Sequence, residues 1–456
     1  MKTTIYNIIM ALLLLFPFAT IAQNWKEVGG LNALAATGNI NCICNDISGN
    51  VYIGGDFYNS GFNQYVAKWD GTTWSELGGL DGLAADASIR SLCRFAGNIY
   101  AGGEFSNAGA NRYVAVWNGT AWSELGGLNG LAANRSIYSI CSDPSGNIYA
   151  AGNFTNGATP SSGKIYVAKW NGTNWSELGG LNALAADSTI WSICSDPGGN
   201  IYAAGEFTNA NGKKYVAKWT GSAWIETGGL NALAANDWIM SICSDTLGNI
   251  YAAGYFTNLY GDKYVAKWDG AAWTEVGGVS ALAANDAVFS VFGYTSGNVF
   301  AAGAFTNPSG NHYVARWNGV AWSELGGLNA LAADGLINSV SGNRDGNIFA
   351  GGNFTNSSFN NYLAEYSNGS GIIPVTLNNG LNIFPNPSNG NFTIDFAEGN
   401  TQGSVEIQNV LGERIFSGPV YPALKKEIRL ENIPQGIYIV KLYDGERHYS
   451  RKIMVK

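Results

Sequence analysis

The chain has 456 residues, with 33 Asp and Glu against 25 Lys and Arg, which gives a formal net charge of −8 at pH 7. This length is sufficient for one large domain and one small one. An acidic chain without a run of basic residues repels phosphate backbones, so nucleic acid is excluded as an expected partner.

Residues 1–22 have the features of a secretory signal peptide. Lys2 precedes an apolar run from Ile8 to Ile21, and the small residue Ala22 ends the segment. This run is too short to serve as a membrane-spanning helix. No other segment has the roughly eighteen consecutive apolar residues that such a helix needs. We therefore predict an exported protein without a membrane-spanning segment.

One pattern repeats seven times with a period of about 50 residues. It reads W-S-E-L-G-G-L-N-A-L-A-A, then I-x-S-I-C-S-D, then G-N-I-Y-A-A-G-x-F-T-N, then Y-V-A-K-W-N-G. A repeat of this length is typical of propellers, solenoids and arrays. The W-x-E element opens at Trp25, Trp74, Trp122, Trp175, Trp224, Trp273 and Trp322.

Each repeat contains four short segments with strand character, which we name strands a to d from the centre outward. Examples are Ile137 to Ser142 for strand a, Asn147 to Phe154 for b, Tyr166 to Trp170 for c, and Ala121 to Leu125 for d. The Asn-Gly or Asp-Gly pairs between strands c and d are strong hairpin signals. Four antiparallel strands make one blade, so residues 23–371 are predicted to form an all-β, seven-bladed β-propeller.

The repeat begins and ends out of phase. The chain starts with a strand d, Trp25 to Val28, and its last repeat ends with a strand c, Tyr362 to Tyr366. We therefore predict that one blade combines both ends, which removes exposed sheet edges. Two charges support this register. Glu365 occupies a slot that is basic in most other copies, and Lys26 occupies a slot that otherwise holds Ser, Thr or Ile, so the two should face each other.

The six cysteines are not spaced for disulfides. Five occupy one slot of strand a in successive repeats, and Cys42 lies two residues before the first of them. Equivalent slots in stacked sheets are separated by about 10 Å, whereas a disulfide needs Cα atoms within about 7 Å. We interpret these thiols as packing residues. The five are Cys44, Cys93, Cys141, Cys194 and Cys243.

The repeat resembles a known propeller family. An apolar run followed by Gly-Gly or Ala-Gly in strand b, a Tyr in strand c and a Trp at the start of strand d resemble the kelch-type repeat, which also occurs in the central domain of galactose oxidase. The resemblance spans the repeats between Trp25 and Tyr366. It implies the propeller fold and does not imply an activity.

From residue 372 the repeat is absent. Alternating apolar runs separated by Gly and Pro turns predict a small C-terminal β-sandwich over residues 372–456. N-I-F-P-N-P-S-N-G-N-F, V-L-G-E-R-I-F and I-P-Q-G-I-Y-I-V-K-L closely resemble the type A sorting domain of the Bacteroidetes type IX secretion system. The resemblance implies contact with that machinery, export across the outer membrane, and then surface attachment or release. An ordinary interaction sandwich is the alternative. The motif residues are Pro385, Asn386, Pro387, Gly390, Gly412 and Gly436.

Residues for catalysis or metal binding are scarce. Only two histidines are present, His312 and His448, which excludes a three-histidine zinc site and a galactose-oxidase-like copper site. No G-x-S-x-G or D-x-D-x-D-G motif occurs. The glutamate of strand d recurs in every copy, so we interpret it as framework. We expect no metal and no cofactor.

A site that binds one ligand requires positions that differ among the seven repeats. Two positions of the repeat vary in this way. The second residue of strand a is Asn41, Arg90, Tyr138, Trp191, Met240, Phe289 or Asn338. The residue before the Phe of strand b is Asp56, Glu104, Asn153, Glu206, Tyr255, Ala304 or Asn353. Both slots fall at the face that carries the b-c and d-a loops, and the b-c loops vary most, the longest spanning residues 157–164.

Variable loops on a rigid scaffold are where binding usually resides. The candidate binding residues at the mouth of the central channel are Arg90, Tyr138, Trp191, Trp238, Tyr255 and Tyr260, with Arg135 beside them. Three functions stay open. The first is a secreted or surface-displayed module that recognises a glycan or a protein without catalysis. The second is a carbohydrate-active lyase or hydrolase that uses Glu104 and Glu206 as acid and base. The third is a structural or adhesive surface protein without a small ligand.

Overall fold

The computed structural model describes residues 25–79, 82–157, 162–278, 281–294, 297–367, 381–396, 403–409, 413–420, 425–430, 433–444 and 447–456. The predicted signal peptide and residues 158–161 of the longest b-c loop lie outside these ranges. The chain divides into two compact units, residues 1–370 and 371–456. Every named element is a β-strand, so the predicted all-β class is confirmed. Among the described residues no helix is long and apolar enough to cross a membrane.

The two inner strands of each sheet are longer than the two outer ones. Strand a corresponds to β2 (Ile40–Asn45), β6 (Ile89–Phe95), β10 (Ile137–Ser142), β14 (Ile190–Ser195), β18 (Ile239–Ser244), β22 (Val288–Gly293) and β26 (Ile337–Gly342). Strand b corresponds to β3 (Val51–Gly55), β7 (Asn98–Gly103), β11 (Ile148–Gly152), β15 (Ile201–Gly205), β19 (Ile250–Gly254), β23 (Val299–Gly303) and β27 (Ile348–Gly352).

The outer strands have three residues each. Strand c corresponds to β4 (Ala67–Trp69), β8 (Ala115–Trp117), β12 (Ala168–Trp170), β16 (Ala217–Trp219), β20 (Ala266–Trp268), β24 (Ala315–Trp317) and β28 (Ala364–Tyr366). Strand d corresponds to β1 (Trp25–Glu27), β5 (Trp74–Glu76), β9 (Trp122–Glu124), β13 (Trp175–Glu177), β17 (Trp224–Glu226), β21 (Trp273–Glu275) and β25 (Trp322–Glu324).

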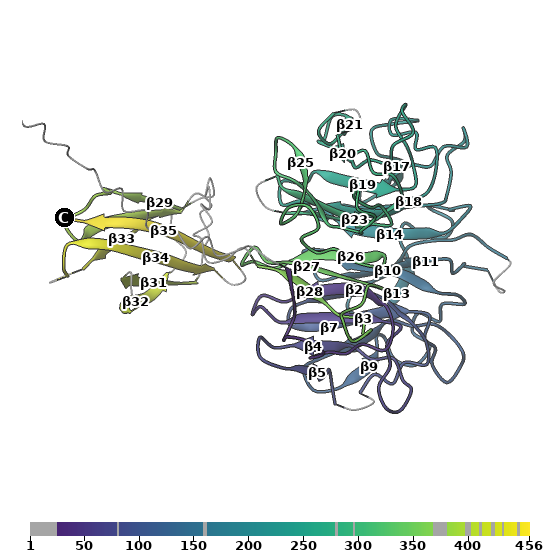
Figure 1. Cartoon of the computed structure of the whole chain (residues 1–456), viewed down its shortest axis with the longest axis horizontal. Coiled ribbons are helices and arrows are strands. Elements are labelled where there is room, and N and C mark those ends of the chain that lie inside the picture. Colours follow the sequence, from purple (N-terminus) through teal and green to yellow (C-terminus); the bar gives the residue numbers. More distant parts are fainter. Residues whose placement is uncertain are drawn as a thin grey trace, which may run out of the picture. The chain divides into compact units, whose positions relative to one another are not determined.

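These strands form seven four-stranded antiparallel sheets arranged in a closed ring. We number them 1 to 7, so that sheet 1 contains β2–β5 and sheet 7 contains β26–β28 with β1. The innermost strands contact one another in sequence from β2 to β26, and β26 contacts β2 again. Accordingly, the green strands β26–β28 lie beside the purple strands β2 and β3 (Figure 1). The predicted propeller architecture is confirmed.

Sheet 7 combines the two ends of the repeat unit, as the phase of the repeat predicted. β1 pairs with β28, and Lys26 lies opposite Glu365. The Lys26 Nζ and Glu365 Oε2 atoms form an ion pair at 3.1 Å. The ring of Trp25 contacts the ring of Tyr366 at 5.6 Å between centroids. The register and the ion pair that were inferred from the two charges are therefore confirmed.

The tryptophan of strand d joins each sheet to the preceding one. Its indole N–H donates a hydrogen bond of 2.8–3.1 Å to the carbonyl oxygen of the residue that follows strand d of the preceding sheet. Trp224, for example, donates to Leu178. Trp25 makes the same bond to Leu325 across the closure. Trp74, Trp122, Trp175, Trp273 and Trp322 make the others. The tryptophan ring is thus part of the framework.

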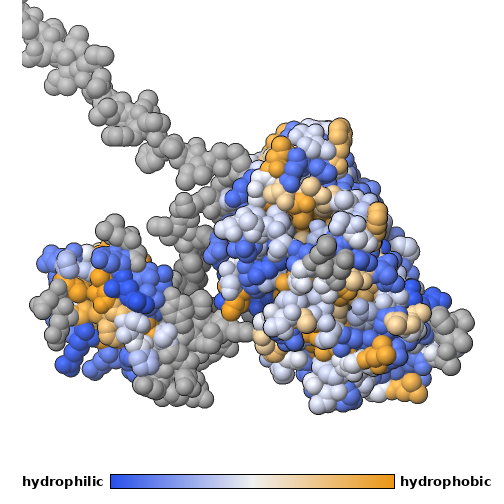
Figure 2. All heavy atoms as spheres, turned by 90° about the horizontal axis from the view of Figure 1, so that it is seen from below, coloured by the Kyte–Doolittle hydropathy of each residue, from blue (hydrophilic) through white to orange (hydrophobic). Residues whose placement is uncertain are grey.

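Strand b is buried on both faces because each sheet packs between two others. All five residues of β15 are buried, and the hydrophobic cluster there joins Tyr149 of sheet 3 to Ile201 and Phe207 of sheet 4. The six cysteines are free thiols beside these clusters. Burial raises the pKa of Cys44 and Cys243 to about 12, which keeps them protonated and unreactive. Exposed apolar side chains occur as separate patches on the face seen in Figure 2.

Strands b, c and d are shorter than the apolar pattern predicted. Phe154 follows β11, and its ring packs edge-on against Tyr166 at 5.0 Å between centroids, before β12 begins. Ile165 forms an isolated bridge to Ala186 of the next d-a segment instead of extending the ladder. The flanking apolar residues are therefore buried by packing between loops, a contact that a strand pattern does not reveal.

The C-terminal unit has two sheets, as the turn pattern predicted. One contains β29 (Leu381–Phe384), β30 (Asn391–Phe396) and β33 (Lys425–Arg429). The other contains β31 (Gly403–Asn409), β32 (Arg414–Val420), β34 (Gly436–Asp444) and β35 (Arg447–Val455). A single hydrophobic cluster that includes Phe392, Ile407 and Val440 lies between the two sheets.

Deletion of residues 23–28 is expected to cause aggregation and a lower melting temperature. The deletion removes β1, leaves the edge of β28 unpaired, and removes the bond from Trp25 to Leu325. Size-exclusion chromatography and thermal unfolding measure both effects. Lys26→Ala is the control, because an ion pair with a side chain 61% exposed contributes at most about 1 kcal/mol. A soluble monomer of unchanged melting temperature would contradict the closure.

Stability is expected to fall between pH 10 and pH 12. Burial, followed by a nearby strand d glutamate, raises the pKa to about 12 for Tyr113, Tyr166, Tyr215, Tyr264 and Tyr362. An unfolded tyrosine titrates near pH 10. The unfolded chain therefore loses its protons first, and stabilisation that is complete below pH 10 is lost as the pH rises through this window.

Thermal unfolding followed by circular dichroism from pH 8 to pH 12 measures this decline. The double variant Tyr215→Phe, Tyr264→Phe removes two of the titrating groups while keeping the rings. It should show a shallower decline than the unsubstituted chain. An identical pH profile would show that these hydroxyls do not control alkaline stability.

Candidate binding site

The second residue of strand a is a β-bulge in all seven sheets. In sheet 4, Ile190 pairs with Gly205 and Ser192 pairs with Ala204, so Trp191 has no partner in β15. A bulge redirects the side chain of the extra residue. We call the seven bulge residues the bulge ring: Asn41, Arg90, Tyr138, Trp191, Met240, Phe289 and Asn338. The most variable slot of strand a is therefore also the least constrained by pairing.

The glycine that ends strand b makes room for the bulge. A Cβ atom on Gly205 would lie 2.1 Å from the carbonyl oxygen of Thr189, the residue just before β14. That oxygen accepts a hydrogen bond from the backbone N–H of Glu206 at 2.9 Å. In every sheet the corresponding distance from an added Cβ is 1.9–2.2 Å. The glycine thus places both variable slots side by side at one end of the sheet.

Sheets 7, 1 and 2 contribute the polar arc, which consists of Asn338, Asn41, Asp56, Arg90 and Glu104. Asn338 Nδ2 lies 3.4 Å from Asn41 Oδ1, and Asn41 Nδ2 donates to Asp56 Oδ1 at 3.0 Å. Arg90 contacts Glu104 Oε1 through Nε at 2.9 Å and through Nη2 at 2.7 Å. The two side chains are 37% and 33% exposed, so this ion pair is accessible to a ligand.

Sheets 3 to 6 contribute the aromatic arc, which consists of Tyr138, Trp191, Tyr255 and Phe289. The rings of Tyr138 and Trp191 lie 4.4 Å apart at an angle of 33°. The ring centroids of Tyr255 and Phe289 lie 6.1 Å apart. Burial, followed by nearby aspartates, raises the pKa of Tyr255, so its hydroxyl stays protonated and can donate. The aromatic arc therefore forms an apolar surface with polar groups at its edge.

Hydrogen-bonding groups lie next to the aromatic arc. The Trp191 indole N–H donates to Glu206 Oε1 at 2.9 Å, and Ser188 Oγ donates to Glu206 Oε2 at the same distance. Asn153 Nδ2 lies 3.4 Å from the Tyr138 hydroxyl. The Asn153 Oδ1 atom is buried and has no hydrogen-bond partner among the described residues.

The structure places five of the six predicted binding residues on this rim. Arg90, Tyr138 and Trp191 are bulge residues, Tyr255 follows β19, and Trp238 contacts Tyr255 edge-on at 5.6 Å. Tyr260 lies in the b-c turn instead and is 74% exposed, and Arg135 lies exposed in the d-a loop. Sequence reasoning missed the bulge itself. The glycine that ends every strand b was the available signal.

Glu104 and Glu206, the catalytic alternative, are separated by sheet 3 and have different partners. Glu104 is paired with Arg90, whereas Glu206 accepts hydrogen bonds from Trp191 and Ser188. Each carboxylate is therefore held by donors of its own sheet. This arrangement positions the aromatic and cationic groups of the rim.

The repeated glutamate of strand d has a framework contact in each sheet. In sheet 4, Glu226 accepts hydrogen bonds from Asn209 Nδ2 and from the backbone N–H of Asn231. Glu27 accepts the same bond from Asn356 across the closure. Among the described residues no group of three His, Cys, Asp or Glu could hold a metal ion. His312 forms an isolated bridge to Ala333 and is half-buried.

The sorting-motif residues lie at the start of the C-terminal unit and at its strand ends. Asn386 bridges to β35, where its Oδ1 accepts from Met454 N–H at 2.9 Å and its Nδ2 donates to Lys452 O at 2.8 Å. Pro385 and Pro387 flank it. Gly390 has φ of +96°, and an added Cβ would lie 2.6 Å from Leu430 O. Gly436 is the first residue of β34, and Gly412 lies outside the described residues.

Residues 382–456 match the family model described as the secretion system C-terminal sorting domain. This match confirms the predicted type IX sorting domain. The protein is therefore exported across the outer membrane to the cell surface or the extracellular space, and a sorting domain of this kind implies an interaction with the secretion machinery. Comparison with curated proteins gave no match.

Two solved structures share the fold. The extracellular domain of BT3049 from B. thetaiotaomicron, a candidate hybrid two-component system, is 13% identical, with a TM-score of 0.50 over 95% of this chain and 57% of that one. The extracellular domain of BT4673 from B. thetaiotaomicron is 13% identical, with a TM-score of 0.52 over 93% of this chain and 52% of that one. The chain thus spans about half the length of these domains. The fold and the tail define a secreted or surface propeller protein, and the kelch resemblance stays a prediction.

Gly205→Ala is expected to lower the free energy of unfolding by about 1–3 kcal/mol, because the new Cβ forces Thr189 and the bulge apart. The environment of Trp191 should change with it. Thermal unfolding and tryptophan fluorescence measure the two effects. Gly198→Ala, in an exposed turn of the same sheet, is the control and should stay within about 0.5 kcal/mol. Equal stability of the two variants would show that the glycine does not support the bulge.

Proposed function

We propose that the protein is a secreted or surface-displayed lectin-like module that binds a glycan at the bulge ring without catalysis. The observation that carries the proposal is the division of the ring into an aromatic arc and a polar arc. A sugar has an apolar C–H face that packs against aromatic rings and hydroxyl groups that need hydrogen-bond partners. The rim offers both kinds of surface on one rigid ring.

The available polar groups favour a neutral or weakly polar ligand. The charge of Arg90 is balanced by Glu104, so the cation of the bulge ring is already paired in the free protein. The Asn153 Oδ1 atom accepts no hydrogen bond from the described residues, and a sugar hydroxyl can donate to it. Asp56 already accepts hydrogen bonds from Asn39, Asn41 and Ser88, which fixes the polar arc before binding.

The framework positions hold the same residue in every sheet. This constancy supports a binding role for the positions whose residue differs from sheet to sheet. Strand d keeps its Trp and Glu in every sheet, because these residues join the sheets and hold the b-c loops. The bulge slot has no pairing partner and holds six residue types in seven sheets. Specificity for one ligand requires such a break in symmetry. The two glutamates have structural partners, so they support binding geometry rather than acid–base chemistry.

Trp191→Ala is expected to weaken glycan binding at least tenfold, because it removes one ring of the pair with Tyr138 and a donor to Glu206. A glycan array probed with the full chain identifies a ligand, and calorimetry measures its affinity. Tyr138→Phe keeps the ring and should retain most of the affinity. Leu259→Ala is the matched control, since Leu259 is fully exposed in a b-c loop.

Three results would overturn the proposal. The first is the absence of binding to any glycan together with binding of a protein partner. The second is a hit whose affinity is the same in Trp191→Ala and Leu259→Ala. The third is the release of new reducing ends that stops in Glu206→Gln, which would identify an enzyme.

A further inference from the structure

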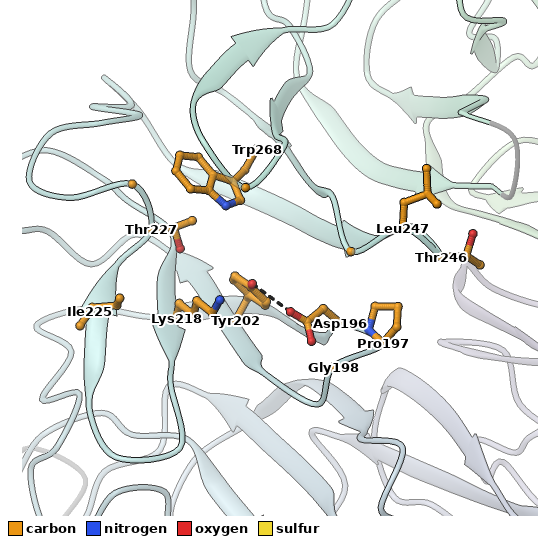
Figure 3. Close-up of a pocket in the computed structure, with 13 residues that line it drawn as sticks. Asp196, Pro197, Gly198, Tyr202, Lys218, Ile225, Thr227, Thr246, Leu247 and Trp268 are labelled. Carbon is orange, nitrogen blue, oxygen red and sulfur yellow. Dashed lines mark hydrogen bonds between the residues drawn. The ribbon is translucent and has the colours of Figure 1, made fainter. Parts of the chain in front are cut away.

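A second site lies between sheets 4 and 5, and none of its lining residues belongs to the bulge ring. A groove of about 450 Å³ is lined there by strands c and d of sheet 4, by the a-b turns of both sheets and by Trp268 of sheet 5 (Figure 3). The turn residues include Asp196 and Leu247. Strand a begins at the bulge and ends at the a-b turn, so the turn residues of the groove and the bulge residues lie at opposite ends of strand a.

Three departures from the repeat converge on this groove. Ile225, Thr227 and Leu247 all line it; the first two belong to strand d of sheet 4 and its end, and Leu247 to the a-b turn of sheet 5. Ile225 is 49% exposed and Leu247 is 81% exposed. The slot of Ile225 otherwise holds Lys26, Ser75, Ser123, Ser176, Thr274 and Ser323. The slot of Leu247 holds Ser48, Ser145, Gly198, Ser296 and Asp345 in five of the other sheets, and the shorter turn of sheet 2 has Ala96 before its glycine.

Ile225 and Leu247 are apolar at positions that are mostly polar in the other sheets. Thr227 differs in the opposite sense, because it has a hydroxyl group where the other sheets have an aliphatic side chain. Its slot otherwise holds Val28, Leu77, Leu125, Leu178, Val276 and Leu325. Thr227 is 2% exposed, and its Oγ1 atom has no hydrogen-bond partner among the described residues. An unpaired buried hydroxyl destabilises the free protein. A ligand atom that accepts a hydrogen bond from it would remove this penalty.

The other polar groups of the groove define what the ligand must supply. The Asp196 carboxylate is occupied, because its Oδ2 atom accepts from Tyr202 at 3.1 Å and from Asn200 at 2.7 Å. Lys218 Nζ lies 5.5 Å from the centroid of the Tyr202 ring and takes part in none of the ion pairs between described residues. The groove therefore offers two donors, the Thr227 hydroxyl and the Lys218 ammonium group, and it needs an acceptor from outside.

We propose that this groove binds an N-acetylated sugar residue. The acetamido carbonyl oxygen accepts from Thr227 and Lys218, and the acetamido methyl group packs against Ile225 and Leu247. The pyranose ring packs on Trp268, whose ring faces Thr227 across the groove in Figure 3. A neutral carbonyl fits better than a carboxylate, because the charge of Asp196 is close by and the repeat unit is acidic. This site is independent of the bulge ring.

The proposal is tested first with N-acetylglucosamine and the full chain. Calorimetry or saturation-transfer NMR should detect binding of N-acetylglucosamine, whereas glucose, which lacks the acetamido group, should bind at least tenfold more weakly. Glucuronate serves as the acidic control. Equal binding of glucose, or tighter binding of glucuronate, would overturn the assigned ligand class.

Two substitutions then locate the binding. Thr227→Val installs the residue that Val28 and Val276 have at the same slot, so the fold should be kept and the melting temperature should rise. Its affinity for N-acetylglucosamine should fall about tenfold. Val276→Thr is the matched control, because it adds a hydroxyl to the same slot of sheet 5. It should lower the melting temperature without changing the affinity.

Unchanged affinity in Thr227→Val, or an equal loss in Val276→Thr, would overturn the site. The double variant Ile225→Ser, Leu247→Ser returns the rim of the groove to the common residues and should also weaken binding. The two sites are distinguished by their variants. Loss of a glycan in Trp191→Ala but not in Thr227→Val assigns that glycan to the bulge ring, and the reverse pattern assigns it to the groove.

Discussion

Each sheet of the ring buries both faces of its strand b, so the unit depends on every sheet having a neighbour on each side. The chain meets this requirement by building sheet 7 from both ends. β1 completes that sheet beside β28, and the Trp25 indole donates to Leu325 of sheet 6. The same indole bond joins all the other sheets. Closure therefore uses the framework contact that holds the rest of the ring and adds only the pair of Lys26 and Glu365 as a register mark.

A rigid ring of this kind allows seven equivalent positions to differ without loss of the fold. The glycine that ends strand b fixes the bulge, because a side chain there would collide with the carbonyl before strand a. The bulge residue is then released from pairing and free to vary. Arg90, Tyr138 and Trp191 occupy equivalent positions and have different chemistry. The ring consequently has a polar arc and an aromatic arc, although every sheet has the same backbone.

Both proposed sites arise where the copies disagree. At the bulge ring the differences are changes of side chain on a shared bulge. In the groove between sheets 4 and 5, Ile225 and Leu247 add apolar surface, and Thr227 adds a buried hydroxyl that has no hydrogen-bond partner in the described part of the chain. The two proposed sites share no residue, so the proposals give one ring two separate places for sugars. The sorting domain explains how such a ring reaches the outside of the cell.

The sequence by itself determined the strands, the out-of-phase closure, the Lys26 and Glu365 pair and the sorting domain, because each depends on local patterns or on a repeat that can be read along the chain. It also located the two variable slots. Only the tertiary structure decided the bulge, the short outer strands and the contact of Tyr138 with Trp191. It alone brought Thr227 to the same groove as Leu247. These features depend on packing between residues that are roughly 15 to 55 positions apart, which a local sequence pattern does not encode.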